Sequence, residues 1–426
     1  MRTASAGKAM PARRCALLST VASGWFTDLL FACQRLELFA LPEELCGSEA
    51  STNPYGLPVF ERPDAILMTV NWYAWLEQQG EAVVDRTFAR LRQASRTIIA
   101  LDGLDMFTLR MSPRGIERVD LVVKAQGVYQ DPELYNYEVG PCYPGANWTG
   151  KLQRARVQYA REHLEKLRLS LPCFIGIDRR IRAHMRRVKA VLSPLQRAVR
   201  NAGDWVSDVE TRLLGRFIRN PVRTVHCAVY LSHIQRLELL LELKRLGISG
   251  LLGVSQVPPH IFGTEYFEQE LPAARLEAIR ADIAAHGLGH RPLNRNRFKR
   301  TMLHHKAVIA PTGYGELTFR HAEAWAQGRA LICQDLSHVE TMFPFRDREN
   351  AVFCRPDFSD IGRLLQDVEA GAIDWRRIGS QGQRDWQAWI ADRAGLFERG
   401  VLRHIEEAMA ASHPPLAEPL LAEAGR

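Results

Sequence analysis

Short apolar runs alternate with helical stretches along the chain, and this alternation restricts the possible folds more than any other feature of the sequence. In the first half, apolar runs at 64–70, 96–105 and 119–129 are typical of buried strands, and residues 73–94 carry apolar side chains at helical spacing. Strands that are apolar on both faces and separated by helices predict a parallel sheet covered by helices. An earlier run, 15–22, predicts a first strand that follows a short disordered leader.

The alternation begins again in the second half of the chain. A predicted helix at 234–247 ends at Gly247, and another at 318–328 ends at Gly328, as is typical of glycine C-caps. Further strands are predicted at 223–231, 248–255, 306–313, 329–335 and 350–355. A chain of 426 residues is also longer than one domain with a single core usually is. The sequence therefore predicts an α/β fold of two doubly wound, Rossmann-like domains.

The predicted boundaries follow from changes in composition along the chain. They are an N-terminal domain at 1–150, a basic helical connector at 151–220, a second domain with terminal helices at 221–411, and a flexible tail at 412–426.

The connector contains a strongly basic run. Eight Arg and Lys residues and no acid occur between 179 and 200, and Pro194 must end or kink a helix there. A solvated helix face is the commoner explanation, and the alternative is a surface for an anionic membrane or a polyanionic acceptor. The run contains no aromatic residue, which argues against a surface that stacks single-stranded nucleic acid but leaves phosphate-only contact open.

Charge and cysteine usage narrow the class of protein. The net charge of +8 favours anionic partners such as phosphates, nucleic acid or a lipid surface. The eight cysteines form no CxxC pair, so we interpret them as reduced core residues of a cytoplasmic protein. No apolar run reaches the roughly 18 residues that a membrane span requires.

The stretch PTGYGELTFRHAEAWAQG, residues 311–328, follows a predicted strand and is the strongest candidate for a binding site. Gly313 and Gly315 would let backbone N–H groups approach a ligand, and the start of the following helix favours an anion. Ligands of open parallel sheets bind at this end of the strands.

Polar side chains of the same stretch predict what the site would hold. Thr318 is expected to cap the helix. The guanidinium of Arg320 could form bidentate hydrogen bonds with a diphosphate. Glu323 lies on the same helix face and could accept hydrogen bonds from sugar hydroxyls such as those of ribose. The alternative is an ordinary surface pair of Arg320 and Glu323 beside a common glycine turn.

The order of these features resembles a known family. LHHKAVIAPTGYGELTFRHAEAWAQGRALICQDL, followed by FPFRDRENAVFCRPDFSDI, resembles the donor-binding domain of glycosyltransferases with the GT-B fold, especially the group 1 and exostosin-like branches. About 60 residues carry the match, through the glycine turn, an arginine, the Glu323-Ala324 pair, Gly328, an apolar strand and the segment ENAVFCRPD.

The resemblance implies a nucleoside diphosphate sugar as donor, bound in the second domain. Glu323 would hold the ribose, and Gly315 and the helix start would face the diphosphate. The donor-binding residues predicted on this basis are Gly313, Gly315, Glu316, Thr318, Arg320, Glu323, Arg236 and Lys306, with Lys299 and Arg300 as further positive charge. Glu316 and Glu323 are one residue closer than the Glu-x7-Glu motif of many retaining members, which leaves the stereochemistry open.

In the same family reading, the first domain binds the acceptor and supplies a catalytic base. Asp102 and Asp105 end the strand at 96–105, where a carboxylate could deprotonate a hydroxyl, although Asp and Gly also simply form turns. Other candidates at strand ends are Lys124, Gln126, Tyr129 and the pair Asn71-Trp72.

These observations predict a metal-independent hexosyltransferase or related enzyme of glycan biosynthesis, with no cofactor beyond its donor. The Asp-x-Asp metal motif of the other large glycosyltransferase fold is absent. The expected acceptor is a glycan or a lipid-linked glycan, and the expected location is the cytoplasm, with membrane contact through 179–200 as an option. The alternatives are an inactive glycosyltransferase-like binding protein and a basic protein that binds polyanions or nucleic acid. A dinucleotide-dependent oxidoreductase is excluded, because no G-x-G-x-x-G turn follows an early strand.

Overall fold

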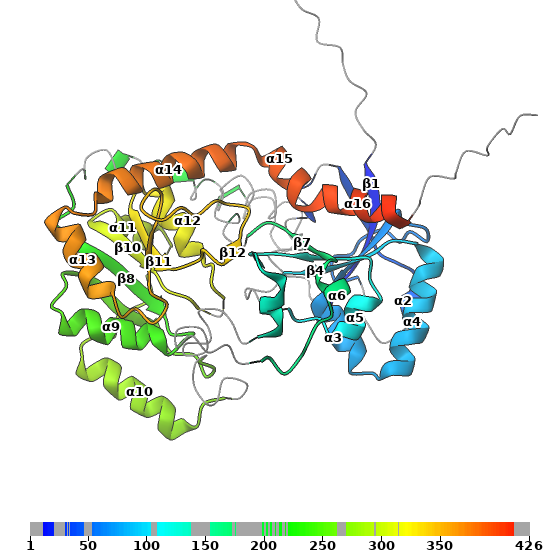
Figure 1. Cartoon of the computed structure of the whole chain (residues 1–426), viewed down its shortest axis with the longest axis horizontal. Coiled ribbons are helices and arrows are strands. Elements are labelled where there is room, and N and C mark those ends of the chain that lie inside the picture. Colours follow the sequence, from blue (N-terminus) through cyan, green and yellow to red (C-terminus); the bar gives the residue numbers. More distant parts are fainter. Residues whose placement is uncertain are drawn as a thin grey trace, which may run out of the picture.

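The computed structural model of the chain consists of two α/β domains that lie next to each other (Figure 1). It describes residues 12–20, 30–46 except 32 and 34, 53–103, 109–137, 154–172, 220–261, 270–293, 295–313 and 315–412, and isolated positions between 175 and 218.

The first domain is built on a six-stranded parallel sheet. Its strands are β1 (Arg13–Leu18), β2 (Leu36–Phe39), β3 (Ala65–Thr69), β4 (Ile98–Asp102), β5 (Leu121–Lys124) and β7 (Leu167–Leu169). They lie in the order β2-β1-β3-β4-β5-β7, and every pair is parallel. The order reverses at the β1/β3 pair, as in a doubly wound sheet.

Short helices accompany this sheet. They are α2 (Glu43–Cys46), α3 (Val70–Glu77), α4 (Glu81–Ala94), α5 (Pro113–Glu117), the 3-10 helix η1 (Pro132–Asn136) and α6 (Arg161–Leu164). The single helix predicted at 73–94 is wrong in one respect, because the chain divides into α3 and α4. Gly80, with a φ of 96°, takes a left-handed conformation between them that glycine adopts readily.

The second domain is built on a five-stranded parallel sheet. Its strands are β8 (Arg223–Tyr230), β9 (Gly250–Gln256), β10 (His305–Ala310), β11 (Ala330–Gln334) and β13 (Val352–Cys354), in the order β13-β11-β10-β8-β9. Its helices are α9 (Gln235–Arg245), α10 (Ala273–Ala285), α11 (Arg295–Met302), α12 (Phe319–Ala326), α13 (Ile361–Ala370) and α14 (Trp375–Ala391). The prediction of two doubly wound, Rossmann-like domains is confirmed.

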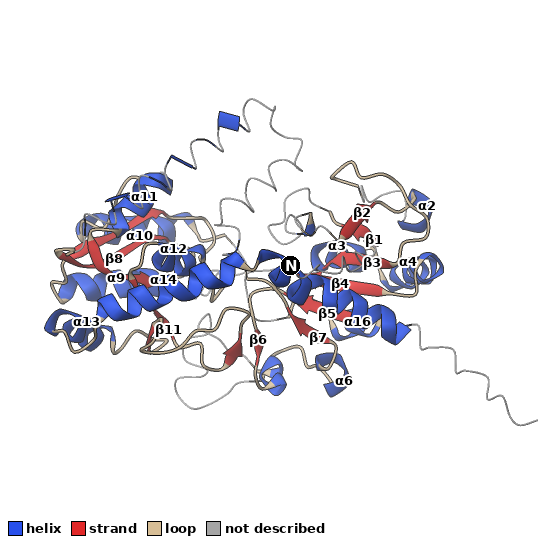
Figure 2. Cartoon of the chain, turned by 90° about the horizontal axis from the view of Figure 1, so that it is seen from above, coloured by secondary structure: helices blue, strands red, loops and turns tan. Residues whose placement is uncertain are grey.

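Two segments connect the domains. β6 (Val128–Tyr129) of the first domain pairs antiparallel with β12 (Val339–Glu340) of the second. After α14, the chain continues through α15 (Arg393–Phe397) and a π-helical turn (Glu398–Leu402) into α16 (Arg403–Ser412), which lies on the first domain (Figure 2). There His404 donates from Nε2 to the Leu169 carbonyl at 2.8 Å.

These contacts correct two predicted boundaries. The first domain does not end at 150, because β7 pairs with β5 and completes the first sheet. The terminal helices do not all belong to the second domain, because Arg35 of the first domain forms a 2.9 Å ion pair with Glu406 of α16. The basic run at 179–200 lies outside the described residues apart from Ala198 and Val199.

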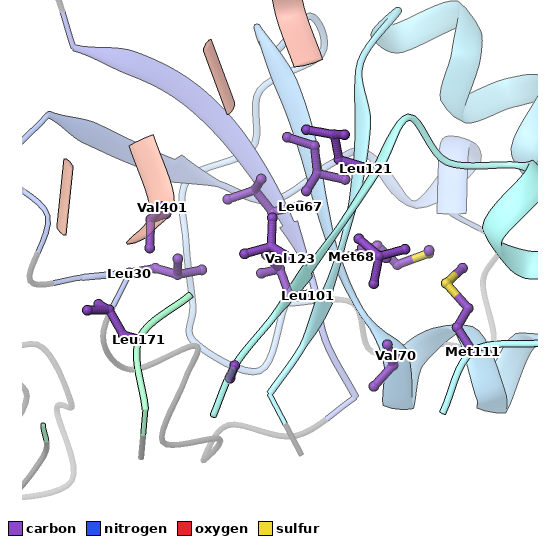
Figure 3. Close-up of a cluster of buried hydrophobic side chains, with 14 of the residues drawn as sticks. Leu30, Leu67, Met68, Val70, Leu101, Met111, Leu121, Val123, Leu171 and Val401 are labelled. Atoms are coloured by element: carbon purple, nitrogen blue, oxygen red, sulfur yellow. The ribbon is translucent and has the colours of Figure 1, made fainter. Parts of the chain in front are cut away.

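Buried apolar side chains stabilise the first domain and pack the C-terminal helical segment against it. Figure 3 shows Leu67, Leu101 and Val123 from three neighbouring strands in one cluster of buried side chains. Val401, from the π-helical turn, belongs to the same cluster. The C-terminal segment is therefore part of the first domain's core.

Cysteines and helix lengths bear on two expectations. Of the eight cysteines, the six that lie in the described residues are buried and free: Cys15, Cys33, Cys46, Cys227, Cys333 and Cys354. For these six, the expected burial in the core is confirmed. Within the described part of the chain, no helix has the length and apolarity that crossing a bilayer requires.

Candidate functional site

The glycine turn lies where the strand order of the second sheet reverses. β8 runs toward β9 on one side, and β10 lies on its other side, so the loops after β8 and β10 diverge at their carboxyl ends. Ligands of doubly wound sheets bind in the crevice at this position. The loop of Pro311–Leu317 after β10 and the loop of Leu231–Ile234 after β8 therefore form the candidate site.

Arg236 holds these two loops together. Its side chain is buried, and it donates to the carbonyl of Tyr230 at 2.6 Å and to that of Pro311 at 2.9 Å. It also donates from Nε to the carbonyl of Thr312. The structure thus gives Arg236 a positioning role at the predicted site, and direct contact with a phosphate stays a prediction.

Gly313 is required by this packing. A Cβ atom at position 313 would lie 2.5 Å from Nη2 of Arg236 and 3.0 Å from Oγ of Ser232. The Gly313 N–H donates to the Gly315 carbonyl at 2.9 Å, which closes a tight turn. A side chain here would displace the guanidinium that holds the loop, so glycine is needed for close approach rather than for an unusual φ.

Gln334 is a residue of this site that the sequence reasoning missed. Its Oε1 accepts from the Thr312 N–H at 2.8 Å, and its Nε2 donates to the Pro356 carbonyl at 2.9 Å. The side chain thus ties the loop after β10 to the loop after β13. The available signal was a polar residue at the end of the otherwise apolar strand ALICQ.

The helix after the turn, α12, begins just after Thr318 as predicted, but the Thr318 side chain does not form the capping hydrogen bond. Thr318 is the N-cap residue, and Nδ1 of His321 lies within hydrogen-bond distance of both its backbone nitrogen, at 3.1 Å, and its carbonyl oxygen, at 3.0 Å. The His321 side chain thus pairs with the backbone of the residue that begins the helix. His321 was not among the predicted site residues, because histidine is not a usual partner of an N-cap.

Arg320 and Glu323 lie near each other on α12. The guanidinium of Arg320 lies over the ring of Phe298 on α11, with 5.4 Å from Cζ to the ring centroid. Glu323 is half-buried, and its charge stabilises the charged form of Arg320. Glu316 is buried on the turn itself. The pKa of Tyr135 in the first domain is raised mainly by burial, and the charges of Asp102 and Glu316 raise it further.

The structure does not bring Lys306 to this site. Lys306 is the second residue of β10, at the amino end of the strand, and its Nζ forms a 2.6 Å ion pair with Glu369 of α13. The glycine turn follows the opposite end of the strand, more than about 13 Å away at 3.3 Å per residue. The predicted phosphate contact of Lys306 is therefore corrected to a structural ion pair. Lys299 is buried in α11, and Arg300 is next to it.

In the first domain, Asp102 does not lie where a base would. The side chains of Asp102 and Lys124 are both 0% exposed, and Nζ lies 3.3 Å from Oδ2. No surface of this carboxylate is open to an acceptor hydroxyl, so we correct the role of Asp102 to that of a buried ion-pair partner. Asp105, the other predicted base, lies outside the described residues.

The remaining candidate residues of the first domain differ in burial and in their contacts. Gln126 is buried and has a φ of 74°, and the Gly127 N–H donates to the Ala125 carbonyl at 3.0 Å. This geometry is the rare classic γ-turn, which is strained. Tyr129 stacks on His338 of the second domain, with 6.0 Å between ring centroids. Trp72 is fully buried, and Asn71 is exposed.

A cavity of about 1140 Å³ lies at the carboxyl ends of β11 and β13, and Gln130 of the first domain is part of its lining. Its lining includes the acidic residues Asp335, Glu340, Asp347, Asp357 and Asp360, together with the basic residue Arg355. Carboxylates disfavour a bound diphosphate, because like charges repel strongly near a protein surface. The arrangement therefore favours the glycine turn, rather than this cavity, for phosphate.

Among the residues that the structure describes, no group of three or more His, Cys, Asp or Glu side chains could hold a metal ion.

Buried histidines in the second domain make stability depend on pH. Burial lowers the pKa of His305 to about 4, and burial, with the charge of Arg320, lowers that of His321 to about 4. An unfolded histidine has a pKa near 6.5, so the unfolded chain binds more protons between pH 6.5 and 4. The stability that each histidine contributes is therefore fully present above pH 6.5. Toward pH 4 the free energy of unfolding falls by about 1 kcal/mol per pH unit for each histidine.

The expected result is a melting temperature that declines steadily as the pH is lowered from 7 to 4.5. His305→Gln should make the decline shallower by the contribution of one histidine. The substitution removes a buried side chain whose protonation the folded state disfavours. His286→Gln is the matched control, since His286 is exposed at the end of α10. Equal slopes in the wild type and His305→Gln, measured by calorimetry, would contradict the assignment.

Comparisons with known proteins give structural similarity alone. No protein-family model matches the chain, and no curated protein matches it. Among solved structures, HepE of Anabaena in complex with UDP is 12% identical, with 94% of this chain and 99% of that chain covered and a TM-score of 0.43. The α,α-trehalose-phosphate synthase (UDP-forming) of Burkholderia vietnamiensis is 10% identical, with the same coverage and a TM-score of 0.46. A glycosyltransferase from Rickettsia africae is 9% identical, with the same coverage and a TM-score of 0.44.

The architecture itself decides the fold. Two Rossmann-like domains follow each other in the chain, and the C-terminal helix returns to the first of them. This is the arrangement that the resemblance to GT-B glycosyltransferases implies. The chain has a GT-B fold.

Proposed function

We propose that this protein is a glycosyltransferase that transfers a sugar from a nucleoside diphosphate sugar to a hydroxyl group of an acceptor. The observation that carries the proposal is the Gly313 turn at the reversal point of the second sheet, fixed by Arg236 and next to the starts of α9 and α12. Two helix N-termini and free approach to the backbone favour an anion such as a diphosphate.

The residues of the turn would divide the donor between them. Backbone N–H groups at Gly315 and at the start of α12 would face the diphosphate, with Arg320 as additional positive charge. Glu323 would accept from the ribose hydroxyls. Positive charge and helix dipoles can stabilise a nucleoside diphosphate as leaving group without a metal ion, so we propose metal-independent transfer.

The first domain would hold the acceptor. Asp105 is the proposed base, because a carboxylate at this strand end could take the proton of the attacking hydroxyl. A glycan or a lipid-linked glycan is the proposed acceptor, in the cytoplasm, with 179–200 as the segment for contact with an anionic membrane. These assignments rest on the sequence.

Glu323→Ala is expected to weaken binding of the donor nucleotide by roughly 10- to 100-fold, because a charged hydrogen-bond acceptor contributes about 1.5–3 kcal/mol. The fold should stay intact, since Glu323 is half-buried rather than in the core. Titration calorimetry with the nucleoside diphosphate that binds the wild type measures the change. Glu277→Ala, on an exposed part of α10, is the control and should bind normally. An unchanged Kd for Glu323→Ala would remove this residue from the site.

A further inference from the structure

The helical segment 198–214 carries a group of exposed apolar side chains. Its described positions, 198–199, 202, 205–206, 209 and 213–214, are all in helical conformation. Among the residues that the structure describes in the whole chain, eight large apolar side chains are exposed, and this segment provides four of them: Val199, Trp205, Val206 and Leu213, at 63%, 54%, 55% and 48%. Single exposed apolar side chains are ordinary on a protein surface, whereas several close together mark an interaction surface.

Residue spacing places these side chains on one side of the segment. The apolar positions 199, 202, 206, 209 and 213 follow each other at intervals of three and four, which is the repeat of one helix face. Trp205 borders this face, because it lies three residues after Ala202 and four before Val209. Ala202 is exposed and Val209 is half-buried. The apolar face of 198–214 therefore consists of Val199, Ala202, Trp205, Val206, Val209 and Leu213.

The C-terminal end of the segment is attached to the second domain. The Ile218 N–H donates to the Leu214 carbonyl at 2.8 Å, so helical hydrogen bonding continues past the segment. Nη2 of Arg329, a buried residue just before β11, donates to the Ile218 carbonyl at 3.3 Å. Nη2 of Arg376, on α14, donates to Oδ1 of Asn220 at 2.6 Å. The segment is thus held on the second domain at one end, and the apolar face is nevertheless exposed.

The charge around the apolar face decides which partner fits it. Eight Arg and Lys residues and no acid precede it between 179 and 200, and from 179 to 219 eleven Arg and Lys residues stand against three acids. A second copy of the chain would bring these positive charges together, and like charges across an interface are unfavourable. An anionic lipid surface attracts basic segments, takes up apolar side chains and favours Trp at the level of its headgroups.

We propose that the apolar face of 198–214 docks on an anionic phospholipid bilayer, with Trp205 and Val206 inserted between the headgroups. Amphipathic helices lie in the plane of the interface in this way, with the apolar side about 5–10 Å deep. The docking rests on the membrane contact that the proposed function assigns to 179–200, but on no step of the sugar transfer. The basic run attracts the protein to the surface, and the apolar face anchors it there.

A double variant removes the anchor without disturbing the core. Trp205→Gln with Val206→Ser replaces two side chains that are more than half exposed, so the fold loses no buried contact of similar size. Both substitutions leave the charge of the segment unchanged, so attraction to an anionic surface is kept. Val59→Ser is the matched control, because Val59 is 61% exposed but lies in the first domain.

The experiment is co-sedimentation of the full chain with vesicles of equimolar phosphatidylcholine and phosphatidylglycerol, and separately with vesicles of pure phosphatidylcholine. We expect the wild type and Val59→Ser to bind the anionic vesicles and to bind the neutral vesicles much less. The double variant should bind the anionic vesicles at least about tenfold more weakly, because interfacial binding strengthens with the apolar area that is buried. Melting temperatures should be equal for all three proteins.

Two results would overturn the docking. If the double variant binds anionic vesicles as tightly as the wild type, the apolar face does not enter the bilayer, and basic charge alone accounts for the binding. If the wild type binds neither kind of vesicle, the bilayer is not the partner. A dimer that the double variant loses in analytical ultracentrifugation would then assign the face to a second copy. The rise in melting temperature with nucleoside diphosphates, measured without vesicles, tests the donor site separately, so failure of the docking and failure of the proposed function are distinguishable.

Discussion

Lys124→Met is expected to lower the free energy of unfolding by about 3–5 kcal/mol. The substitution leaves the carboxylate of Asp102 buried without its positive partner, and an uncompensated buried charge is among the most destabilising single changes. Both residues lie at the carboxyl ends of neighbouring strands, β4 and β5, where they are also partners in the sheet register. Urea unfolding of the first domain, followed by circular dichroism, measures the loss.

Two further variants show whether burial causes this effect. The double variant Asp102→Leu and Lys124→Met should recover most of the stability, because two apolar side chains replace a buried pair at little cost. Arg161→Met removes a partner of Glu165 in an exposed pair and should change stability by less than about 0.5 kcal/mol. If Lys124→Met were as mild as Arg161→Met, the pair would not be buried in solution.

Arg236→Met is expected to weaken donor binding by at least about 100-fold and to lower stability by about 3 kcal/mol or more. Its guanidinium donates to three carbonyls of the loops after β8 and β10, and a hydrogen bond with a charged donor contributes about 1.5–3 kcal/mol. Without it, the two loops lose the side chain that sets their distance, so the turn no longer presents its N–H groups together.

Gly313→Ala tests the same contact from the other side. The added Cβ would lie 2.5 Å from Nη2 of Arg236, so the guanidinium must move and the binding loss should resemble that of Arg236→Met. Gly289→Ala is the control, because its nearest neighbour would be 3.9 Å away, an ordinary contact. Donor affinity by calorimetry and melting temperature separate the two effects. Normal binding by Gly313→Ala would show that this turn does not position the donor.

Local pattern was sufficient for most of the fold. Strands such as β3, with the sequence AILMT, and β10, with HKAVIA, bury both faces, and their apolar character is visible in the sequence. Gly247 and Gly328 end their helices with φ values of 66° and 62°, as predicted. The glycine turn could also be placed, because strand, turn and helix follow each other directly there.

Long-range pairing could not be predicted in the same way. β7 has three half-buried residues and no distinctive pattern, so only its pairing with β5 assigns it to the first domain. Lys306 and Arg236 are both basic residues near strands, but the first lies at the amino end of β10 and pairs with Glu369. Sequence shows that a residue is charged, and tertiary structure decides which end of the sheet it reaches.

The most direct test of the donor site is the melting temperature of the purified wild-type protein with UDP, GDP, dTDP, CMP and a short DNA duplex. A ligand that binds only the folded protein stabilises it by about 2.7 kcal/mol at 100 times its Kd. We predict a rise with one nucleoside diphosphate that is lost in Gly313→Ala and kept in Gly289→Ala. A rise with DNA alone, or with none of the ligands, would contradict the proposed glycosyltransferase.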